Sequence, residues 1–274
     1  MEKKIRRMVY ILGVLSCLVL LSLLYGYVRY VLISWLERIK VHHWERLPDL
    51  GKEPHIIVVT HDTYMEPLLT YALFLHIILK GIWKALRTRN FGEIERRIPI
   101  SLVASNYIKI LIFLPILWPL FTIFISVDRS KEKKSVFKRG ISALRVIKCV
   151  NKGRSPLAAP QGTRTYKHPD KIVSEKGNKI GRFQPGVGFT AAKTGIPILP
   201  IGYKGTIEVL PNSRWAFLLL FFTPILMHWR GPIEVNIGNP RRISIDTSFE
   251  KHAAREAADQ EIMDALLATV DEIT

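Results

Sequence analysis

The sequence predicts an α/β fold in which a mixed, largely parallel sheet is covered by helices, with a membrane helix near the N-terminus. Three observations support this expectation. Short apolar runs of strand length recur along the chain, helix-length segments separate several of them, and one long uncharged apolar stretch lies near the N-terminus. Strands that alternate with helices form sheets covered on both faces, because each connecting helix packs back onto the sheet. With 274 residues, the chain can bury one large core.

Six apolar runs have the length of strands and are bounded by polar, Gly or Pro residues. They are Ile56–Val59, Ser101–Ala104, Phe124–Val127, Leu157–Ala159, Ile198–Ile201 and Ile233–Ile237. Helices are expected over Leu68–Arg87, Lys131–Val150 and Phe183–Thr194, and an amphipathic helix over Phe249–Ile273.

Residues 1–30 are interpreted as a retained membrane anchor. The stretch Met8 to Val28 carries no charge and meets the length of ~20 apolar residues that a helix needs to cross a bilayer. A signal peptide, the alternative, has a shorter apolar core and a small-residue cleavage site. Because basic residues flank the stretch on both sides, its orientation stays open, and so does the choice between a spanning helix and a hairpin that dips in and returns.

Residues 31–46 are expected to form an amphipathic connector at the membrane interface, because Trp35 and Trp44 stand beside Arg38 and Lys40. The globular body is expected over residues 47–274.

Two further apolar runs, Ile108 to Val127 and Trp215 to Trp229, contain prolines or are short for a membrane span. Buried core is the favoured interpretation of both runs. The alternative is that one of them dips into a bilayer or lines a channel for an acyl chain.

The charge balance points to a phosphate-rich partner, because 40 basic residues against 23 acidic ones give a net charge of +17. The apolar N-terminus favours an anionic membrane surface over nucleic acid, and the scattered basic residues match no nucleic-acid-binding motif. Cys17 lies in the anchor and Cys149 in an expected helix, so a disulfide framework is not expected. This cysteine usage favours a body that faces the reducing cytoplasm.

A histidine and a carboxylate follow the first predicted strand of the body. His61 and Glu66 are five residues apart, which would place them on different faces of one straight helix. They can meet only if His61 sits on the turn that enters the helix. The segment Thr63 to Glu66 supports this geometry, because it matches the S/T-x-x-E capping box that starts a helix. A carboxylate behind an imidazole fixes its tautomer and stabilises the imidazolium formed when it accepts a proton.

Other interpretations of these residues remain open. Glu66 could cap the helix and do nothing more, and His61 could be an ordinary surface or packed histidine. Asp62 is a rival partner for His61, but adjacent side chains seldom converge.

A second polar cluster follows the run that ends at Ala159. Gly162, Thr163 and Arg164 form a turn whose N–H groups, hydroxyl and guanidinium could hold an oxyanion or a phosphate. Arg129, at the end of another predicted strand, could reach the same crevice. The alternatives are an ordinary Pro-x-Gly turn with a solvated arginine, and a surface ion pair for Arg129.

These motifs resemble the glycerolphosphate (lysophospholipid) acyltransferases of the bacterial 1-acylglycerol-3-phosphate acyltransferase type. Four blocks appear in the family's order between about residues 54 and 205. Thr-His-Asp-Thr-Tyr-Met-Glu resembles the family's Asn-His-x-Ser-x-x-Asp. Ile-Ser-Val-Asp-Arg resembles Ile-Phe-Ile-Asp-Arg, Ala-Pro-Gln-Gly-Thr-Arg resembles Phe-Pro-Glu-Gly-Thr-Arg, and the run containing Pro200 resembles the last block.

The resemblance implies a glycerolphosphate acyltransferase-like domain over residues 47–274. It makes His61 and Glu66 the catalytic pair. It assigns acceptor binding to four residues, which are Arg129, Gly162, Thr163 and Arg164. The implied reaction moves a fatty acyl group from acyl-coenzyme A or acyl carrier protein to the hydroxyl of a lysophospholipid.

No cofactor is implied, and no metal site is expected, because the remaining histidines show no ligand spacing. Three departures from the family motifs stand out: Glu66 replaces Asp, Thr63 replaces Ser and Gln161 replaces Glu. The last one removes a negative charge beside the acceptor site. It leaves open an amino-acid lipid or glycolipid acceptor, and a lipid-binding relative with a weakened site.

Overall fold

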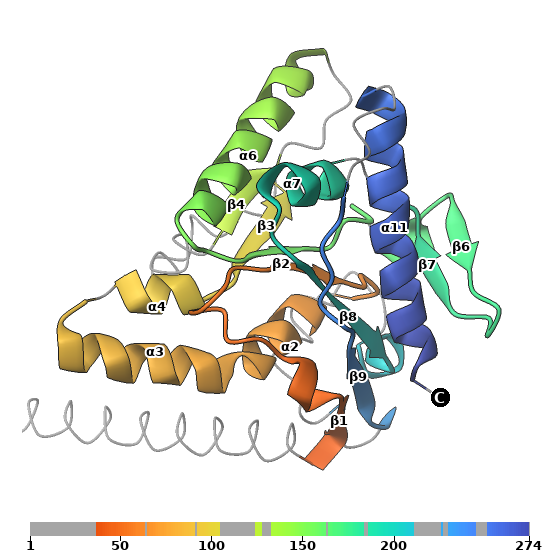
Figure 1. Ribbon diagram of the computed structural model, residues 1–274. Helices are drawn as coiled ribbons and strands as arrows, with labels where there is room; N and C mark the ends of the chain where they lie inside the picture. The colour runs from red at the N-terminus through yellow and green to blue at the C-terminus, as the bar shows by residue number, and fades with distance from the viewer. Residues whose placement is uncertain are drawn as a thin grey trace, which may run out of the picture.

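The computed structural model describes residues 37–63, 65–90, 92–104, 124–127, 133–162, 164–183, 186–210, 226, 230–244 and 251–273. The expected membrane anchor, residues 1–30, lies outside these ranges. Most of the two further apolar runs also lies outside them. Figure 1 shows the described part as a central sheet with helices on both sides.

A seven-stranded sheet forms the centre of the molecule, in the order β1-β9-β8-β2-β5-β3-β4. Its strands are β1 (Ile39–His42), β2 (Ile56–Val59), β3 (Ile100–Ala104), β4 (Phe124–Val127), β5 (Pro156–Ala158), β8 (Ile198–Lys204) and β9 (Ile233–Ile237). Among these strands every neighbouring pair is parallel except β8 and β9. The predicted mixed, largely parallel sheet is therefore confirmed, and each of the six predicted strands is present.

Strand β1 lies inside the segment expected to be an interfacial connector. Ile39 pairs with Ile233 and His42 with Asn236 in parallel register with β9. The sheet therefore begins before residue 47, where the globular body was expected to start. The antiparallel hairpin of β6 (Lys171–Val173) and β7 (Lys179–Gly181) was not predicted either.

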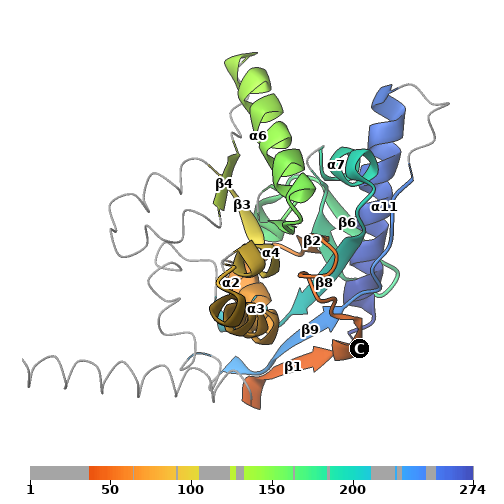
Figure 2. The ribbon, with the colours of Figure 1, turned by 60° about the vertical axis from the view of Figure 1, so that its left-hand side comes forward.

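Helices cover both faces of the sheet, as Figures 1 and 2 show. One face carries α2 (Met65–Leu73), α3 (Leu75–Thr88) and α4 (Gly92–Arg97). The other face carries α6 (Lys133–Asn151), α7 (Val187–Thr194) and α11 (Lys251–Asp271). Short helical turns occur at η1 (Trp44–Arg46), η3 (Thr165–Lys167) and α8 (Thr206–Val209).

The prediction of a single helix over Leu68–Arg87 is wrong. The segment forms two helices, α2 and α3, which bend by 53° at their junction.

Strand β2 divides the core because its side chains alternate between the two faces of the sheet. Ile57 and Val59 pack into the cluster that contains Met65 of α2. Ile56 and Val58 pack into the cluster that contains Ala191 of α7 and residues of α11. All four β2 residues are buried, as is typical of a parallel strand covered on both faces.

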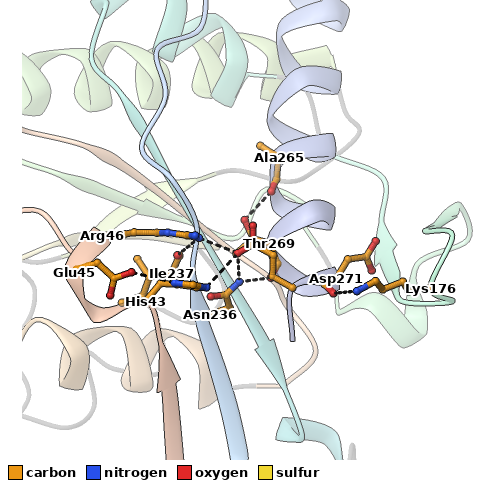
Figure 3. A network of polar contacts seen from close by, with 10 residues as sticks. His43, Glu45, Arg46, Lys176, Asn236, Ile237, Ala265, Thr269 and Asp271 are labelled. Carbon is orange, nitrogen blue, oxygen red and sulfur yellow. Dashed lines mark hydrogen bonds and ion pairs between the residues drawn. The ribbon is translucent and has the colours of Figure 1, made fainter. Parts of the chain in front are cut away.

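The C-terminal end of α11 is tied to the sheet by a polar network (Figure 3). Asn236 of β9 donates to the Thr269 carbonyl at 2.8 Å and to Glu272 at 2.9 Å, and Arg46 of η1 donates to Glu272 at 2.8 Å. Burial alone would raise the pKa of Glu272, but these hydrogen bonds outweigh it and lower the pKa. The network joins η1, near the start of the described body, to the end of α11, its last element.

Helices α7 and α11 approach each other closely at Gly188. A Cβ atom there would lie 2.6 Å from the Asp259 nitrogen. The Asp259 carboxylate accepts hydrogen bonds from the Gly188 N–H at 2.7 Å and the Gly186 N–H at 3.2 Å. An acidic side chain of α11 thus caps the start of α7, where the first N–H groups have no partner inside the helix.

In the described part of the chain, no single helix is long and apolar enough to cross a membrane. Helices α2 and α3 pass that test of length and composition only when taken together.

Candidate active site

The residues of the candidate site follow the carboxyl ends of neighbouring parallel strands. Strand β2 pairs with β5 on one side and with β8 on the other. His61 comes two residues after β2, Gln161 three residues after β5, and Thr206 two residues after β8. Parallel strands end at the same edge of the sheet, which is where α/β proteins assemble their sites. The two motifs, a hundred residues apart, therefore reach one edge.

A hydrogen-bonded loop joins the His61 motif to the Gln161 motif. The Thr165 N–H donates to the His61 carbonyl oxygen at 2.8 Å. The Thr165 hydroxyl donates to Gln161 Oε1 at 3.2 Å, and the Gln161 side chain is completely buried. Thr165 thereby fixes the backbone of His61 relative to the second motif.

Helix α2 starts with the predicted capping box. The Thr63 hydroxyl accepts a hydrogen bond from the Met65 N–H at 3.0 Å, and Glu66 Oε1 accepts one from the Thr63 N–H at 2.8 Å. This reciprocal pattern satisfies donors at the helix start. Glu66 therefore does cap the helix, but it does so with one of its two oxygens.

Glu66 Oε1 accepts three further hydrogen bonds. The donors are the Asp62 N–H at 3.2 Å, the Thr63 hydroxyl at 3.1 Å and the Thr206 hydroxyl at 2.9 Å. Its second oxygen, Oε2, is buried and accepts no hydrogen bond from any residue that the structure describes. Burial, together with the nearby Asp62 carboxylate, raises the pKa of Glu66 to about 7. Glu66 thus sits where its ionisation responds to small changes near neutral pH.

The His61 imidazole is half-buried, and its Nδ1 atom lies below the surface. It stands at the turn between β2 and α2, which is the position that the five-residue spacing to Glu66 requires. His61 Nδ1 and Glu66 Oε2 make no hydrogen bond to each other in this structure, so the catalytic pairing of the two residues stays a prediction.

Asp62, the rival partner for His61, lies in a different set of contacts. Burial raises the pKa of Asp62, the Thr165 side chain opposes that shift by hydrogen bonding to it, and Glu208 of α8 adds to it. Its carboxylate is thus held by η3, while its backbone N–H supports Glu66.

The structure describes part of the predicted acceptor-binding set. Gly162 adopts φ +73° in a turn closed by its N–H and the Ala159 carbonyl at 3.2 Å. Arg164 follows as the half-buried N-cap residue of η3. Thr163 and Arg129 lie outside the described residues.

Pro200 occupies a buried position in the middle of the sheet. It pairs with Val58, and its carbonyl accepts a hydrogen bond from the Gly238 N–H at 2.9 Å. These contacts explain its place in the fold, and a part in substrate binding stays a prediction.

Two threonines of the site were not predicted from the sequence, Thr165 and Thr206. Each follows closely after a motif residue or a strand end, as Thr165 follows Arg164 and Thr206 follows β8. A hydroxyl just past a parallel strand is a usable signal, because such residues gather at the same sheet edge. Behind them, the Tyr203 hydroxyl and the Thr70 hydroxyl share a buried hydrogen bond of 2.7 Å.

The class of protein follows from the comparison with known families. A model of the family described as Acyltransferase matches residues 38–204, which is more than half of the chain and includes the His61, Glu66 and Gln161 positions. The chain belongs to the acyltransferase family.

Individual relatives extend this comparison. A chloroplastic 1-acyl-sn-glycerol-3-phosphate acyltransferase of Brassica napus is 36% identical over 74 residues, which are 27% of this chain and 19% of that protein. The chain therefore matches about a fifth of the length of this relative. The 1-acyl-sn-glycerophosphate (LPA) acyltransferase PlsC of Thermotoga maritima aligns with a TM-score of 0.49 at 15% identity, over 86% of this chain and 72% of that one.

Proposed function

We propose that this protein is a membrane-bound acyltransferase that transfers a fatty acyl group from an acyl thioester to the hydroxyl of 1-acylglycerol-3-phosphate, in phospholipid synthesis. The observation that carries the proposal is the buried Glu66 carboxylate beside the strand end that bears His61, inside the region that matches the family. The activity that names the Brassica napus relative supports the choice of acceptor.

In the proposed mechanism, His61 Nε2 accepts the proton of the acceptor hydroxyl while the hydroxyl oxygen attacks the thioester carbonyl carbon. The new C–O ester bond forms, the C–S bond breaks, and the imidazolium returns the proton to the leaving thiolate. Glu66 Oε2 accepts the His61 Nδ1–H, which fixes the tautomer and balances the imidazolium charge. Transfer is direct, because neither cysteine is close to His61 in sequence and no serine lies in a nucleophile-elbow context.

The proposed acceptor site uses the turn after β5. Gly162 at φ +73° turns the backbone, and its own N–H closes that turn on the Ala159 carbonyl, so the proposed oxyanion donors are neighbouring backbone N–H groups of the turn; Arg164 follows directly. Arg129 and Thr163 are proposed to complete the phosphate site. The net charge of +17 supports binding of an anionic lipid and an anionic donor, coenzyme A or acyl carrier protein, with the body on the cytoplasmic side.

Gln161 favours a second candidate, which is transfer to a lysolipid with another headgroup, an amino-acid lipid or a glycolipid. Its side chain is completely buried between the Gly162 turn and Thr165, and it is neutral where the family motif has a carboxylate. The test is the ratio of transfer to lysophosphatidate over transfer to a lysolipid without phosphate, in the wild type and in Gln161→Glu. A ratio that Gln161→Glu leaves unchanged would contradict a role for Gln161 in acceptor choice.

The proposed function is tested by transfer of a labelled acyl group from acyl-coenzyme A, and separately from acyl carrier protein, to lysophosphatidate by the detergent-purified chain. Activity in the wild type and a loss of at least a thousandfold in His61→Ala are expected, because removal of a catalytic base typically costs that much. His55→Ala is the matched control. His55 is a histidine next to β2 as well, more buried than His61, but it precedes that strand, at the opposite edge of the sheet.

Full transfer by His61→Ala would overturn the mechanism. A folded wild type that transfers to neither class of acceptor, from either donor, would overturn the activity and leave a lipid-binding relative with a weakened site.

A further inference from the structure

Helix α3 carries three distinct faces. At about 100° per residue, the residues Ile77, Gly81 and Ala85 share one side, and all three are buried against the body. A second side, centred well over 90° away, is apolar but exposed. Its members are Leu75, Leu79, Ile82, Trp83 and Leu86. A third side carries the cations Lys80, Lys84 and Arg87.

The exposed apolar face of α3 is continuous, which the ordinary surface of a soluble protein is not. Trp83 is 65% exposed, Leu86 is 62% exposed and Leu79 is 54% exposed. These positions recur at helical spacing over three turns, so the side chains form one stripe rather than scattered single residues. Scattered exposed apolar residues are normal on a soluble protein, but a contiguous stripe marks an interaction surface.

The cationic face borders this stripe directly. On the helical wheel Lys80, Lys84 and Arg87 lie within about 60° of one another, between Trp83 of the stripe and Ile77 of the buried face. The Arg87 guanidinium lies over the Trp83 ring at 6.0 Å from its centroid. A helix with an apolar stripe and an adjoining row of cations has the pattern of one that lies in the plane of a membrane interface.

A second tryptophan extends the surface beyond α3. Trp44 of η1 is 48% exposed, and its ring meets His76 of α3 edge-to-face with centroids 6.1 Å apart. Tryptophan is enriched at the level of lipid headgroups, because its ring is apolar and its N–H is polar. We call the surface made by Trp44, Leu79, Ile82, Trp83 and Leu86 the α3 surface.

We propose that the α3 surface docks on an anionic phospholipid bilayer, with Trp83 and Leu86 inserted among the acyl chains and the neighbouring cations on the headgroups. The choice of a bilayer as the occupant rests on charge complementarity, since the cations of α3 border the stripe and would contact anionic headgroups. This docking deepens the proposed function, because it names the surface that would bring a lipid acceptor to the site.

The position of α3 in the fold explains why docking would serve the site. Glu66 lies in the first turn of α2, and α3 follows α2 after the bend at Phe74, whose side chain is completely buried. The α3 surface and the His61 turn are therefore joined through two packed helices. In Figures 1 and 2, α3 lies on the opposite side of the sheet from α6, α7 and α11. Docking through α3 would leave those three helices turned away from the lipid.

Labelling at single sites in the full chain tests the proposal. A fluorophore that reports polarity is attached at Leu86→Cys, and separately at Glu261→Cys on α11 as the matched control, with Cys17 and Cys149 replaced by serine. Each protein is reconstituted in vesicles of phosphatidylcholine with or without phosphatidylglycerol. In the anionic vesicles, nitroxide groups on the lipid acyl chains should quench the Leu86 label severalfold more than the Glu261 label. Equal quenching at the two sites would overturn the proposal.

Two other occupants of the surface are separate outcomes that would also overturn it. If the Leu86 label is shielded from a water-soluble quencher without vesicles and the protein is dimeric, a second copy covers the surface. If it is shielded in a monomer, residues 8–28 of the same chain cover it.

An activity measurement separates docking from catalysis. In the double variant Leu79→Glu and Leu86→Glu, the rate of transfer to lysophosphatidate held in vesicles should fall about tenfold. The rate of transfer to a short-chain acceptor dissolved as a monomer should stay the same. An unchanged rate on vesicles would overturn the proposal. A wild type that transfers to neither acceptor would refute the proposed function. The quenching measurement would still show whether the α3 surface docks on the bilayer.

Discussion

The Thr206 hydroxyl donates a hydrogen bond of 2.9 Å to Glu66 Oε1, although 140 residues separate the two positions. The contact exists because β8 lies beside β2 in the sheet, so that the residues following the two strands meet at one edge. It occupies the oxygen of Glu66 that also caps α2. The other oxygen is left for His61 in the proposed mechanism.

Substitution of Thr206 should therefore act through Glu66. Thr206→Ala removes a hydrogen bond to a carboxylate, an interaction worth about 1.5–3 kcal/mol, and we expect kcat to fall at least tenfold. The hydrogen bond from Thr206 lowers the pKa of Glu66, so the acid limb of the pH–rate profile should move to higher pH in the variant. Steady-state kinetics between pH 5 and 9 measure both effects.

Thr206→Ser is the control for that experiment, because it keeps the hydroxyl and should restore the wild-type pH–rate profile. A reduced kcat with an unmoved profile would show that Thr206 only packs the start of α8.

Glu66 should also make stability depend on pH. Its pKa is about 7 in the folded chain against an ordinary value of 4.5, so folding favours the protonated form. The stability that this preference contributes is fully present below about pH 4.5 and is lost as the pH rises through about 7. The total change is roughly 3 kcal/mol.

Glu66→Gln cannot ionise and should remove this dependence. We expect the variant to gain stability relative to the wild type between pH 5 and 8, measured by urea unfolding at each pH. Parallel curves for the two proteins would contradict a buried, titrating Glu66. The variant should at the same time lose acyl transfer, because a neutral amide cannot balance the imidazolium charge.

Gly205 is expected to be indispensable for the placement of Thr206. Its φ of +84° is strained for any residue with a side chain, and a Cβ atom would lie 2.6 Å from the Pro232 carbonyl oxygen. Gly177 has nearly the same φ, +83°, with nothing within 4 Å of its Cβ position. Gly177→Ala thus measures the backbone strain alone, at about 1 kcal/mol or slightly more.

Gly205→Ala should cost about 1–3 kcal/mol beyond that control, and it should lower activity where Gly177→Ala does not. Thermal unfolding and kcat measured side by side would check this, and equal losses in the two variants would show that the Pro232 contact relaxes without consequence.

The sequence predicted which segments form strands and helices better than it predicted which of these elements lie beside one another. Strand β2 is a continuous apolar run, and the capping box at Thr63 has local chemistry, so both were accessible from residues close together in the chain. The break between α2 and α3 was not, because the apolar pattern continues through Phe74, and only the packing of that buried side chain marks the bend. Strand β1 is short and half-exposed at the edge of the sheet, so its pattern resembled that of an interfacial segment.

The same distinction holds for the site. His61 and Glu66 are identified by their spacing and by the capping box, which depend on the six residues from His61 to Glu66. The place of Thr206 just after a strand indicates the sheet edge, but its contact with Glu66 is identified only when the strand order is known, because nothing local to Thr206 indicates that β8 lies beside β2. Contacts that depend on sheet order were therefore the part of the site that the sequence could not supply.

Thr165 provides the last test, because it joins the two motifs. Its N–H bond to the His61 carbonyl survives any side-chain substitution except proline, whereas its hydroxyl bonds to Gln161 Oε1 and to the Asp62 side chain. Thr165→Val keeps the shape but leaves the buried Gln161 Oε1 and the half-buried Asp62 carboxylate without that donor, which should cost about 1–3 kcal/mol. Thr165→Ser should recover most of the loss.

If the loop positions His61, kcat should fall in Thr165→Val while KM for the acyl donor changes little, and Thr165→Ser should restore kcat together with stability. A variant that loses stability but keeps kcat would show that the link between the motifs serves the fold alone. Thermal unfolding and steady-state kinetics on the same preparations separate the two cases, because the folded fraction at the assay temperature corrects the observed rate.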